Sequence, residues 1–202
     1  MTQLLGADDP GLAPRADLAD AVAELTAYAA PDEEQRQTRD RMMAFLGAHP
    51  DGLWRSCTDG HLTGSALVVD AEAERVLVLF HAKVRRWLQP GGHVDGDANL
   101  AAVARREATE ETGIAGLRVV RPLIDLDVHV FHSAGEADHL HLDARFLVLA
   151  PADAVVRGNH ESEGLRWVAL DELPGLDADP GTVRMATRGL ALARHLRTGE
   201  PA

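Results

Sequence analysis

Residues 91–114 constrain the fold and the function more than any other part of the sequence. They begin with a glycine-rich turn, in which the backbone can approach a ligand closely. A helix is predicted over residues 98–112, because Gly113 is typical of a left-handed cap at a helix C-terminus. Asp97 or Asn99 is suited to cap its start. The sequence thus predicts a ligand-binding turn that leads directly into a helix.

Three glutamates of this helix, Glu107, Glu110 and Glu111, lie at positions i, i+3 and i+4. This spacing places their carboxylates on one helix face, where they repel one another. A bound divalent cation would turn the repulsion into attraction, and oxygen ligands suit Mg²⁺ or Mn²⁺. The alternative is a solvated acidic surface, which an isolated Glu-x-x-Glu-Glu pattern would favour. The glycine turn and Gly113 in register favour the metal site.

This stretch resembles the Nudix box, in which a glycine, an arginine, three glutamates and a second glycine lie at fixed spacing on a loop and a helix. The matching residues are Gly92 and the run Arg106-Glu107-Ala108-Thr109-Glu110-Glu111-Thr112-Gly113-Ile114. One position departs from the pattern, since Ala98 replaces its first glutamate, and Ala108 is smaller than the usual aliphatic residue. The segments 61–67, 86–93 and 165–173 also look like Nudix segments, so the resemblance covers about residues 60–175.

The resemblance implies metal binding by Glu107, Glu110 and Glu111, with help from the carbonyl of Gly91. It also implies that Arg106 holds neighbouring carboxylates in place by a bidentate contact. In many members a glutamate from a loop before the last strand acts as a base or an additional metal ligand. The segment His160-Glu-Ser-Glu163 lies in such a loop, so Glu161 is the candidate and Glu163 the second choice; ordinary loop charges are the alternative.

The fold class is expected to be a Nudix-like α/β/α sandwich with a mixed sheet, because strands and helices mix around one core. Residues 1–50 are predicted as an N-terminal helical extension and residues 51–202 as the Nudix hydrolase domain. The first 15 residues contain prolines and glycines and are expected to be loosely ordered. Helices are predicted over 16–30, 31–48 and from Asp179-Pro180 onward, and strands over 61–69, 76–81, 117–123, 126–132, 140–149 and 166–169.

Charge and composition limit the class of substrate. The formal net charge is −12, and such a surface repels polyanions, so binding to a nucleic-acid polymer or an anionic membrane is not expected. The single cysteine, Cys57, excludes an intrachain disulfide. No apolar run approaches membrane-spanning length and the N-terminus lacks a signal design, so a cytoplasmic protein is expected. The expected partner is a small phosphorylated substrate, and a homodimer is left open.

Three residues outside the glutamate cluster are candidates for substrate binding: His93 after the glycine pair, Arg86 before the turn, and Arg145 on a strand predicted to alternate. On that strand His141, Asp143 and Arg145 are expected on one face, with Leu140, Leu142, Ala144 and Phe146 on the other. Zinc binding by His129, His132, His139 and His141 is an alternative reading, which the absence of cysteine partners and of a tight pairwise spacing disfavours.

The function implied is metal-dependent hydrolysis of a pyrophosphate bond in a nucleoside diphosphate linked to another moiety, or in a related organic pyrophosphate. The alternative is a Nudix-fold binding or regulatory module with weakened catalysis, which only Ala98 favours. Isomerisation and RNA decapping find no support, since the chain has no basic tract and no cysteine near the box. With Ala98 unable to accept a hydrogen bond, Arg106 is expected to pair with Asp97 or Asp95 instead.

Overall fold

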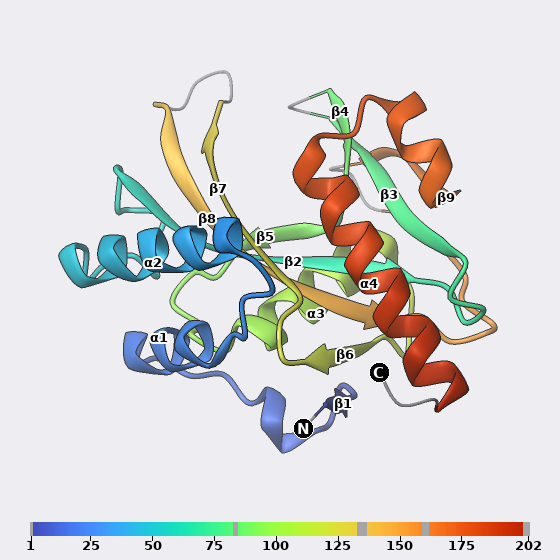
Figure 1. Cartoon of the computed structure of the whole chain (residues 1–202), viewed down its shortest axis with the longest axis horizontal. Coiled ribbons are helices and arrows are strands. Elements are labelled where there is room, and N and C mark those ends of the chain that lie inside the picture. The colour runs from blue at the N-terminus through green and yellow to red at the C-terminus, as the bar shows by residue number, and fades with distance from the viewer. Residues whose placement is uncertain (1, 83–84, 133–136, 159–161, 200–202) are drawn as a thin grey trace.

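The protein was studied as a computed structural model, which describes residues 2–82, 85–132, 137–158 and 162–199. A mixed β-sheet lies between helix α3 (Leu100–Thr112) on one face and helix α4 (Pro180–Thr198) on the other (Figure 1). The expected α/β/α sandwich is therefore confirmed. None of the helices among the described residues combines the length and apolar character needed to span a membrane.

The sheet is built around two long parallel neighbours, β2 (Gly60–Val69) and β8 (His139–Leu149), which pair along ten positions. The main strand order is β1-β6-β8-β2-β3-β4, and all pairings other than β2–β8 are antiparallel. The remaining strands are β1 (Gln3–Leu5), β3 (Arg75–His81), β4 (Arg86–Leu88), β5 (Gly91–His93), β6 (Arg118–Arg121), β7 (Asp125–Phe131) and β9 (Ser162–Ala169). Strand β5 pairs with β2, β7 with β8, and β9 with β3.

The register of β2 and β8 decides where a polar site can lie. His61 lies opposite His141, and the pairs Thr63–Asp143 and Ser65–Arg145 follow at alternate positions. Because side chains alternate along a strand, all of these residues share one face of the sheet. Farther along the same face, Leu67 and Leu147 pack in the apolar core under α4. The face is therefore apolar at one end and polar at the other, and the alternation predicted for residues 140–146 is confirmed.

The opposite face of the sheet carries the larger apolar core, which α3 shares with two N-terminal helices, α1 (Leu18–Ala27) and α2 (Glu33–Ala48). Leu25 of α1 and Met42 of α2 are buried in one cluster with Leu100 of α3. Both N-terminal helices thus pack against the core of the same chain. A division into domains at residue 50 remains a prediction.

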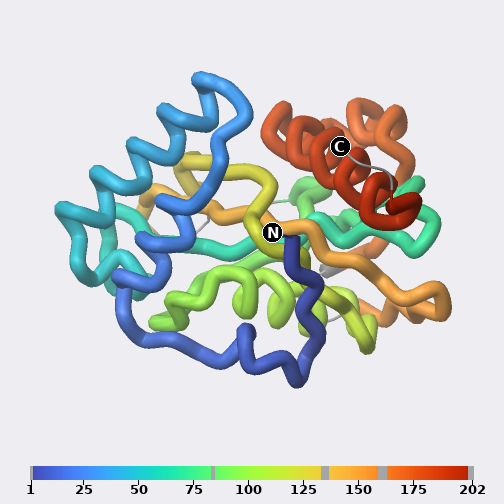
Figure 2. The backbone as a smooth tube through the Cα atoms, turned by 60° about the horizontal axis from the view of Figure 1, so that its bottom comes forward, coloured from blue at the N-terminus to red at the C-terminus, as the bar shows by residue number. Residues whose placement is uncertain are grey.

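The expectation of a loosely ordered start was wrong. Strand β1 joins the sheet beside β6, and a short 3-10 helix, η1 (Pro10–Leu12), follows it. Leu5 and Leu12 are both buried. The segment then runs along the outer side of α3 before α1 begins (Figure 2). Local sequence could not predict this order, because it depends on pairing with residues more than a hundred positions away.

Other elements lie close to their predicted ranges. Helix α3 begins at Leu100 with Asn99 as its cap and ends at Gly113 in the left-handed conformation (φ 65°). Helix α4 begins at Pro180 behind the cap Asp179. Strand β9 is longer than predicted, because it pairs with β3 from Ser162 onward, and a second 3-10 helix, η2 (Leu170–Leu176), follows it.

Candidate active site

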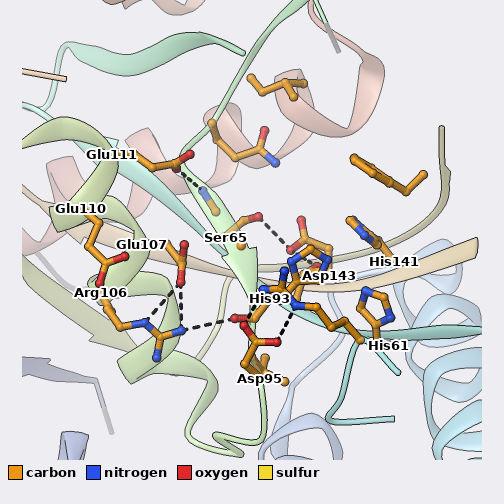
Figure 3. Close-up of a pocket in the computed structure, with 18 of the residues that line it drawn as sticks. His61, Ser65, His93, Asp95, Arg106, Glu107, Glu110, Glu111, His141 and Asp143 are labelled. Atoms are coloured by element: carbon orange, nitrogen blue, oxygen red, sulfur yellow. Dashed lines mark hydrogen bonds and ion pairs between the residues drawn. The ribbon is translucent and has the colours of Figure 1, made fainter. Parts of the chain in front are cut away.

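A cavity of about 1190 Å³ opens where the box turn, helix α3 and the polar ends of β2 and β8 meet. Glutamates of α3 line one side and histidines line the other, with Ser65 between them (Figure 3). The walls thus differ in chemistry, since one offers carboxylate oxygens and the other imidazole nitrogens.

The structure brings the three box glutamates to the same wall, as their spacing requires. Glu107, Glu110 and Glu111 all line the cavity. Glu110 is exposed, whereas Glu111 is only 4% exposed and accepts a hydrogen bond from the backbone N–H of Gly91 at 2.8 Å. This contact orients Glu111 toward the turn and connects the helix to it.

Both glycines of the turn are needed for this close approach. A Cβ atom at Gly92 would lie 2.3 Å from Oε2 of Glu107, and one at Gly91 would lie 2.4 Å from Oγ of Ser65. Neither distance is compatible with van der Waals contact. The turn therefore fits between α3 and β2 only when both positions lack a side chain.

Arg106 holds the carboxylate of Glu107 from the side. Its Nη2 donates to Oε1 of Glu107 at 2.9 Å and to the carbonyl of His93 at 3.3 Å. A second carboxylate, that of Asp97, has its Oδ2 3.9 Å from Nη1 of Arg106. Asp95 is turned away and forms a two-pronged pair with Arg55, which lowers the pKa of Asp95. Of these two acids, Asp97 is the one that forms an ion pair with Arg106 among the described residues, whereas Asp95 pairs with Arg55.

The N-terminal segment explains the alanine at position 98. Ala98 is 1% exposed and belongs to the large apolar core. Its N–H donates to the carbonyl of Arg15 at 2.6 Å, and the N–H of Arg15 donates to Asp97 at 3.0 Å. The segment before α1 therefore covers this position, where a glutamate side chain would have to bury its charge.

The other predicted site residues do not all line the cavity. His93 lines the cavity. Arg86 is exposed on β4. Neither Arg86 nor Arg145 is among the described residues that line the cavity. Their positions therefore do not favour the contacts with substrate that were expected of them. Arg145 is only 2% exposed and is enclosed by carboxylates. Glu161 lies outside the described residues, and Glu163 is exposed and pairs with Arg85.

Arg145 belongs to a buried ionic network that sequence reasoning did not find. Its Nε donates to Asp143 at 2.7 Å, and its other nitrogens contact Asp125 and Asp127 at 3.3 and 3.1 Å. Burial opposes the charge, but these carboxylates raise the pKa of Arg145 above its ordinary value. Arg184 and Arg188 of α4 also bind Asp125. The network locks α4 and β7 to the sheet beneath the cavity.

The second polar wall consists of histidines. His61, His93, His139 and His141 each offer a ring nitrogen, and these four atoms lie within 4.8 Å of one another. Burial lowers the pKa of His141 to about 2 and that of His93 to about 4, and it also lowers the pKa of His61. These rings are therefore neutral near neutral pH, which argues against charge pairing between His93 and a phosphate.

This group differs from the four histidines that the sequence pattern brought together. His139 and His141 belong to both sets, but His132 lies apart and pairs with Asp138 at 2.8 Å, where both side chains are exposed. His129 packs against the ring of His141 and contacts Asp127 at 2.9 Å. Burial alone would lower the pKa of His129, but Asp127 and Asp143 raise it above its ordinary value. The register of the strands determines which four histidines lie together, and sequence spacing does not reveal that register.

Comparison with known proteins agrees with this geometry. A model of the NUDIX domain matches residues 60–187, which is more than half of the chain. The chain belongs to the Nudix family. Among relatives of recorded function, the CMP-5'-(N-acetyl-N-hydroxy-3-aminopropyl)phosphonate hydrolase of Streptomyces rubellomurinus is 33% identical over 129 residues. That match spans 60% of this chain and 58% of the relative's length.

Solved structures show the same fold. A NUDIX-family hydrolase from Clostridium perfringens superposes with a TM-score of 0.51 at 23% identity, covering 65% of this chain and 97% of its own. A MutT NUDIX hydrolase from Burkholderia pseudomallei gives a TM-score of 0.50 at 25% identity, covering 63% and 95%. The chain therefore has the fold of the Nudix family, and it spans a little over half the length of the Streptomyces relative.

Proposed function

We propose that this Nudix hydrolase cleaves the pyrophosphate bond of a nucleoside diphosphate linked to another moiety, or of a related organic pyrophosphate, with Mg²⁺ or Mn²⁺. The observation that carries the proposal is the wall of three glutamates from α3, which faces a cavity that the glycine pair Gly91–Gly92 also lines. Hard oxygen donors on one helix face fit either ion.

Glu107, Glu110 and Glu111 would hold the metal, and we propose the carbonyl of Gly91 as a further ligand. When bound, the metal supplies charge neutralisation on phosphate oxygens and lowers the pKa of a coordinated water. The chain's own contribution is orientation. Arg106 fixes the carboxylate of Glu107, and the N–H of Gly91 fixes that of Glu111, so little reorganisation is needed when charge develops on the substrate.

Glu161 is proposed as the base that accepts a proton from the attacking water. It directly precedes Ser162, which pairs with His81, a residue of the cavity wall. Glu161→Gln should therefore lower turnover more than it changes apparent substrate binding. Glu163→Gln is the matched control, because Glu163 is exposed and paired with Arg85. A larger effect of Glu163→Gln would transfer the role to that residue.

The choice of substrate class follows from the relative and from the charge of the chain. The Streptomyces relative is named for a CMP-linked phosphonate, so a cytidine nucleotide joined to a second phosphorus-containing group is the first compound to test. The formal net charge of −12 disfavours a nucleic-acid polymer.

The test is a panel of nucleoside diphosphate conjugates, nucleoside triphosphates and dinucleoside polyphosphates, assayed with Mg²⁺ or Mn²⁺ and with products identified by mass. We expect a nucleoside monophosphate and a second phosphorylated product from at least one conjugate, and no product in excess chelator. Full hydrolysis in chelator would contradict the metal role, and cleavage of triphosphates alone would contradict the substrate class.

A further inference from the structure

The four histidines on the wall opposite the glutamates have no part in the hydrolysis proposed above. They come from three strands, since His61 lies on β2, His93 on β5, and His139 and His141 on β8. The parallel register sets His61 directly beside His141. The antiparallel pairing of β5 with β2 sets His93 opposite Thr63. Thr63 follows His61 on the same face of β2. The convergence is thus built into the sheet.

Hydrogen bonds fix the orientation of two of the rings. Nδ1 of His61 lies 3.3 Å from the carbonyl of Cys57, and Nδ1 of His139 lies 2.8 Å from the carbonyl of Ala137. A carbonyl only accepts, so each Nδ1 carries the proton and donates it. With the proton on Nδ1, Nε2 is the ring nitrogen whose lone pair a metal ion can take. A backbone carbonyl behind the second ring nitrogen is the usual support of a metal-bound histidine.

The ring nitrogens that meet here do not all have a hydrogen-bond partner among the described residues. Nε2 of His61 is buried, in a side chain that is 3% exposed, and it has no hydrogen-bond partner among the described residues. Nε2 of His139 lies 3.3 Å from Nε2 of His141. One proton on His141 would satisfy that pair, but it would leave His61 unpartnered. Buried polar atoms without partners are rare in folded proteins and call for an explanation.

We propose that His61, His93, His139 and His141 form a binding site for a transition-metal dication, with Zn²⁺ as the ligand, separate from the glutamate site. Tetrahedral Zn²⁺ with nitrogen ligands at about 2.0–2.1 Å places those nitrogens about 3.3–3.4 Å apart, close to the separation of the His139–His141 pair. A modest contraction of the other separations, which reach 4.8 Å, would complete the site. Imidazole nitrogens select zinc and its neighbours over Mg²⁺, which prefers oxygen.

A bound zinc ion would join β2, β5 and β8 at one point. His93 directly follows Gly91 and Gly92, and its carbonyl accepts from Arg106. The ion would therefore hold the end of the box turn against the two central strands. Four protein ligands leave no open position, which is typical of a structural rather than a catalytic zinc site. The proposal does not depend on any substrate or on hydrolysis.

The experiment measures zinc on the full-length protein without substrate. Protein stripped with chelator is loaded with Zn²⁺, desalted in excess Mg²⁺, and analysed for metal per chain and for affinity by competition with a chromophoric chelator. We expect one tightly held zinc per chain and a higher melting temperature on loading. His61→Asn and His141→Asn should each weaken binding at least about 100-fold and remove the thermal shift, since even outer partners contribute 10- to 100-fold.

Three controls separate this site from others. His132→Asn removes an exposed histidine, and His49→Asn disrupts the other candidate group among the described residues, His49, Asp51 and Cys57. Glu110→Gln together with Glu111→Gln weakens the glutamate site. All three proteins should retain the zinc. No retained zinc in wild type, equal retention in His61→Asn and His141→Asn, or loss in any of the controls would overturn the proposal. Circular dichroism of the metal-free variants shows whether lost binding reflects lost folding. If His141→Asn does not fold, His141→Gln replaces it in the zinc measurement.

Discussion

At the scale of single residues, the carboxylate of Glu111 accepts a hydrogen bond from the N–H of Gly91, which orients it toward the turn. Substitution by glutamine keeps the shape of the side chain but removes its charge. We expect Glu111→Gln to lower turnover by about 100-fold or more, as loss of a strong electrostatic stabiliser does. Steady-state kinetics over a range of Mg²⁺ concentrations measure the effect, with the exposed Glu72→Gln as control. An unchanged rate would show that Glu111 does not bind the metal.

Position 98 offers a second test at this scale, because the family pattern and the local packing disagree there. Restoring the box glutamate would place a charge in an apolar core that residues before α1 cover. We expect Ala98→Glu to lower the free energy of unfolding by at least about 2 kcal/mol and not to raise activity. Ala98→Ser, a small polar replacement, is the control for polarity without charge. Chemical denaturation measures both.

If Ala98→Glu instead raised turnover in a protein of unchanged stability, the missing glutamate would be a true loss of catalytic function. The alternative of a weakened binding module, which the box pattern alone left open, would then regain support. The contacts of Ala98 with the segment around Arg15 argue against that outcome.

At the scale of elements, Gln35 connects helix α2 to strand β7. Its side chain is fully buried, donates to the carbonyl of Leu126 at 3.0 Å and accepts from the N–H of Leu126 at 2.9 Å. The hydroxyl of Tyr28, the C-terminal cap residue of α1, donates to the same amide oxygen of Gln35. One side chain thus imitates a neighbouring strand for β7 and holds both helices to the sheet.

We expect Gln35→Ala to lower the free energy of unfolding by about 2–4 kcal/mol, because it leaves two buried backbone groups without partners and opens a cavity. Gln37→Ala, which removes an exposed glutamine on the same helix, should change stability by no more than about 0.5 kcal/mol. Urea denaturation of both variants is the measurement. Equal stabilities would mean that water replaces the amide.

The elements also show what sequence could and could not predict. Periodicity and caps predicted α3 and the start of α4 nearly to the residue, since Asn99, Gly113 and Asp179 act locally. Strand β1 was missed, because three residues form a strand only through distant pairing. The glutamate wall was predictable, as helical spacing alone brings it together. The histidine wall was not, because its members meet only through the pairing of β2 with β5 and β8. Alternate histidines at 139 and 141 were the one local signal.

At the scale of the whole molecule, the N-terminal extension and the family domain share one core. The matched family region begins at residue 60, yet the cluster around α3 includes side chains from β1, η1, α1 and α2. The same extension covers Ala98 and donates to Asp97, so it also fixes the turn at the edge of the cavity. Both the stability of the protein and the geometry of the site should therefore depend on the N-terminal extension.

Deleting residues 1–50 should consequently do more than remove an appendage. The six largest apolar side chains that the segment buries are Leu5, Leu12, Leu25, Tyr28, Met42 and Leu46. Each contributes about 1.5–3 kcal/mol when fully buried, so their sum is comparable to the net stability of about 5–15 kcal/mol typical of a domain. We expect the truncated chain to be unfolded or aggregated. Thermal denaturation and mass in solution test this, with deletion of residues 1–8, which removes only β1, as a milder control. A truncated chain that melts at the same temperature and has the mass of a monomer would show that residues 51–202 form an independent domain, and the shared core would then add nothing to the stability of the hydrolase.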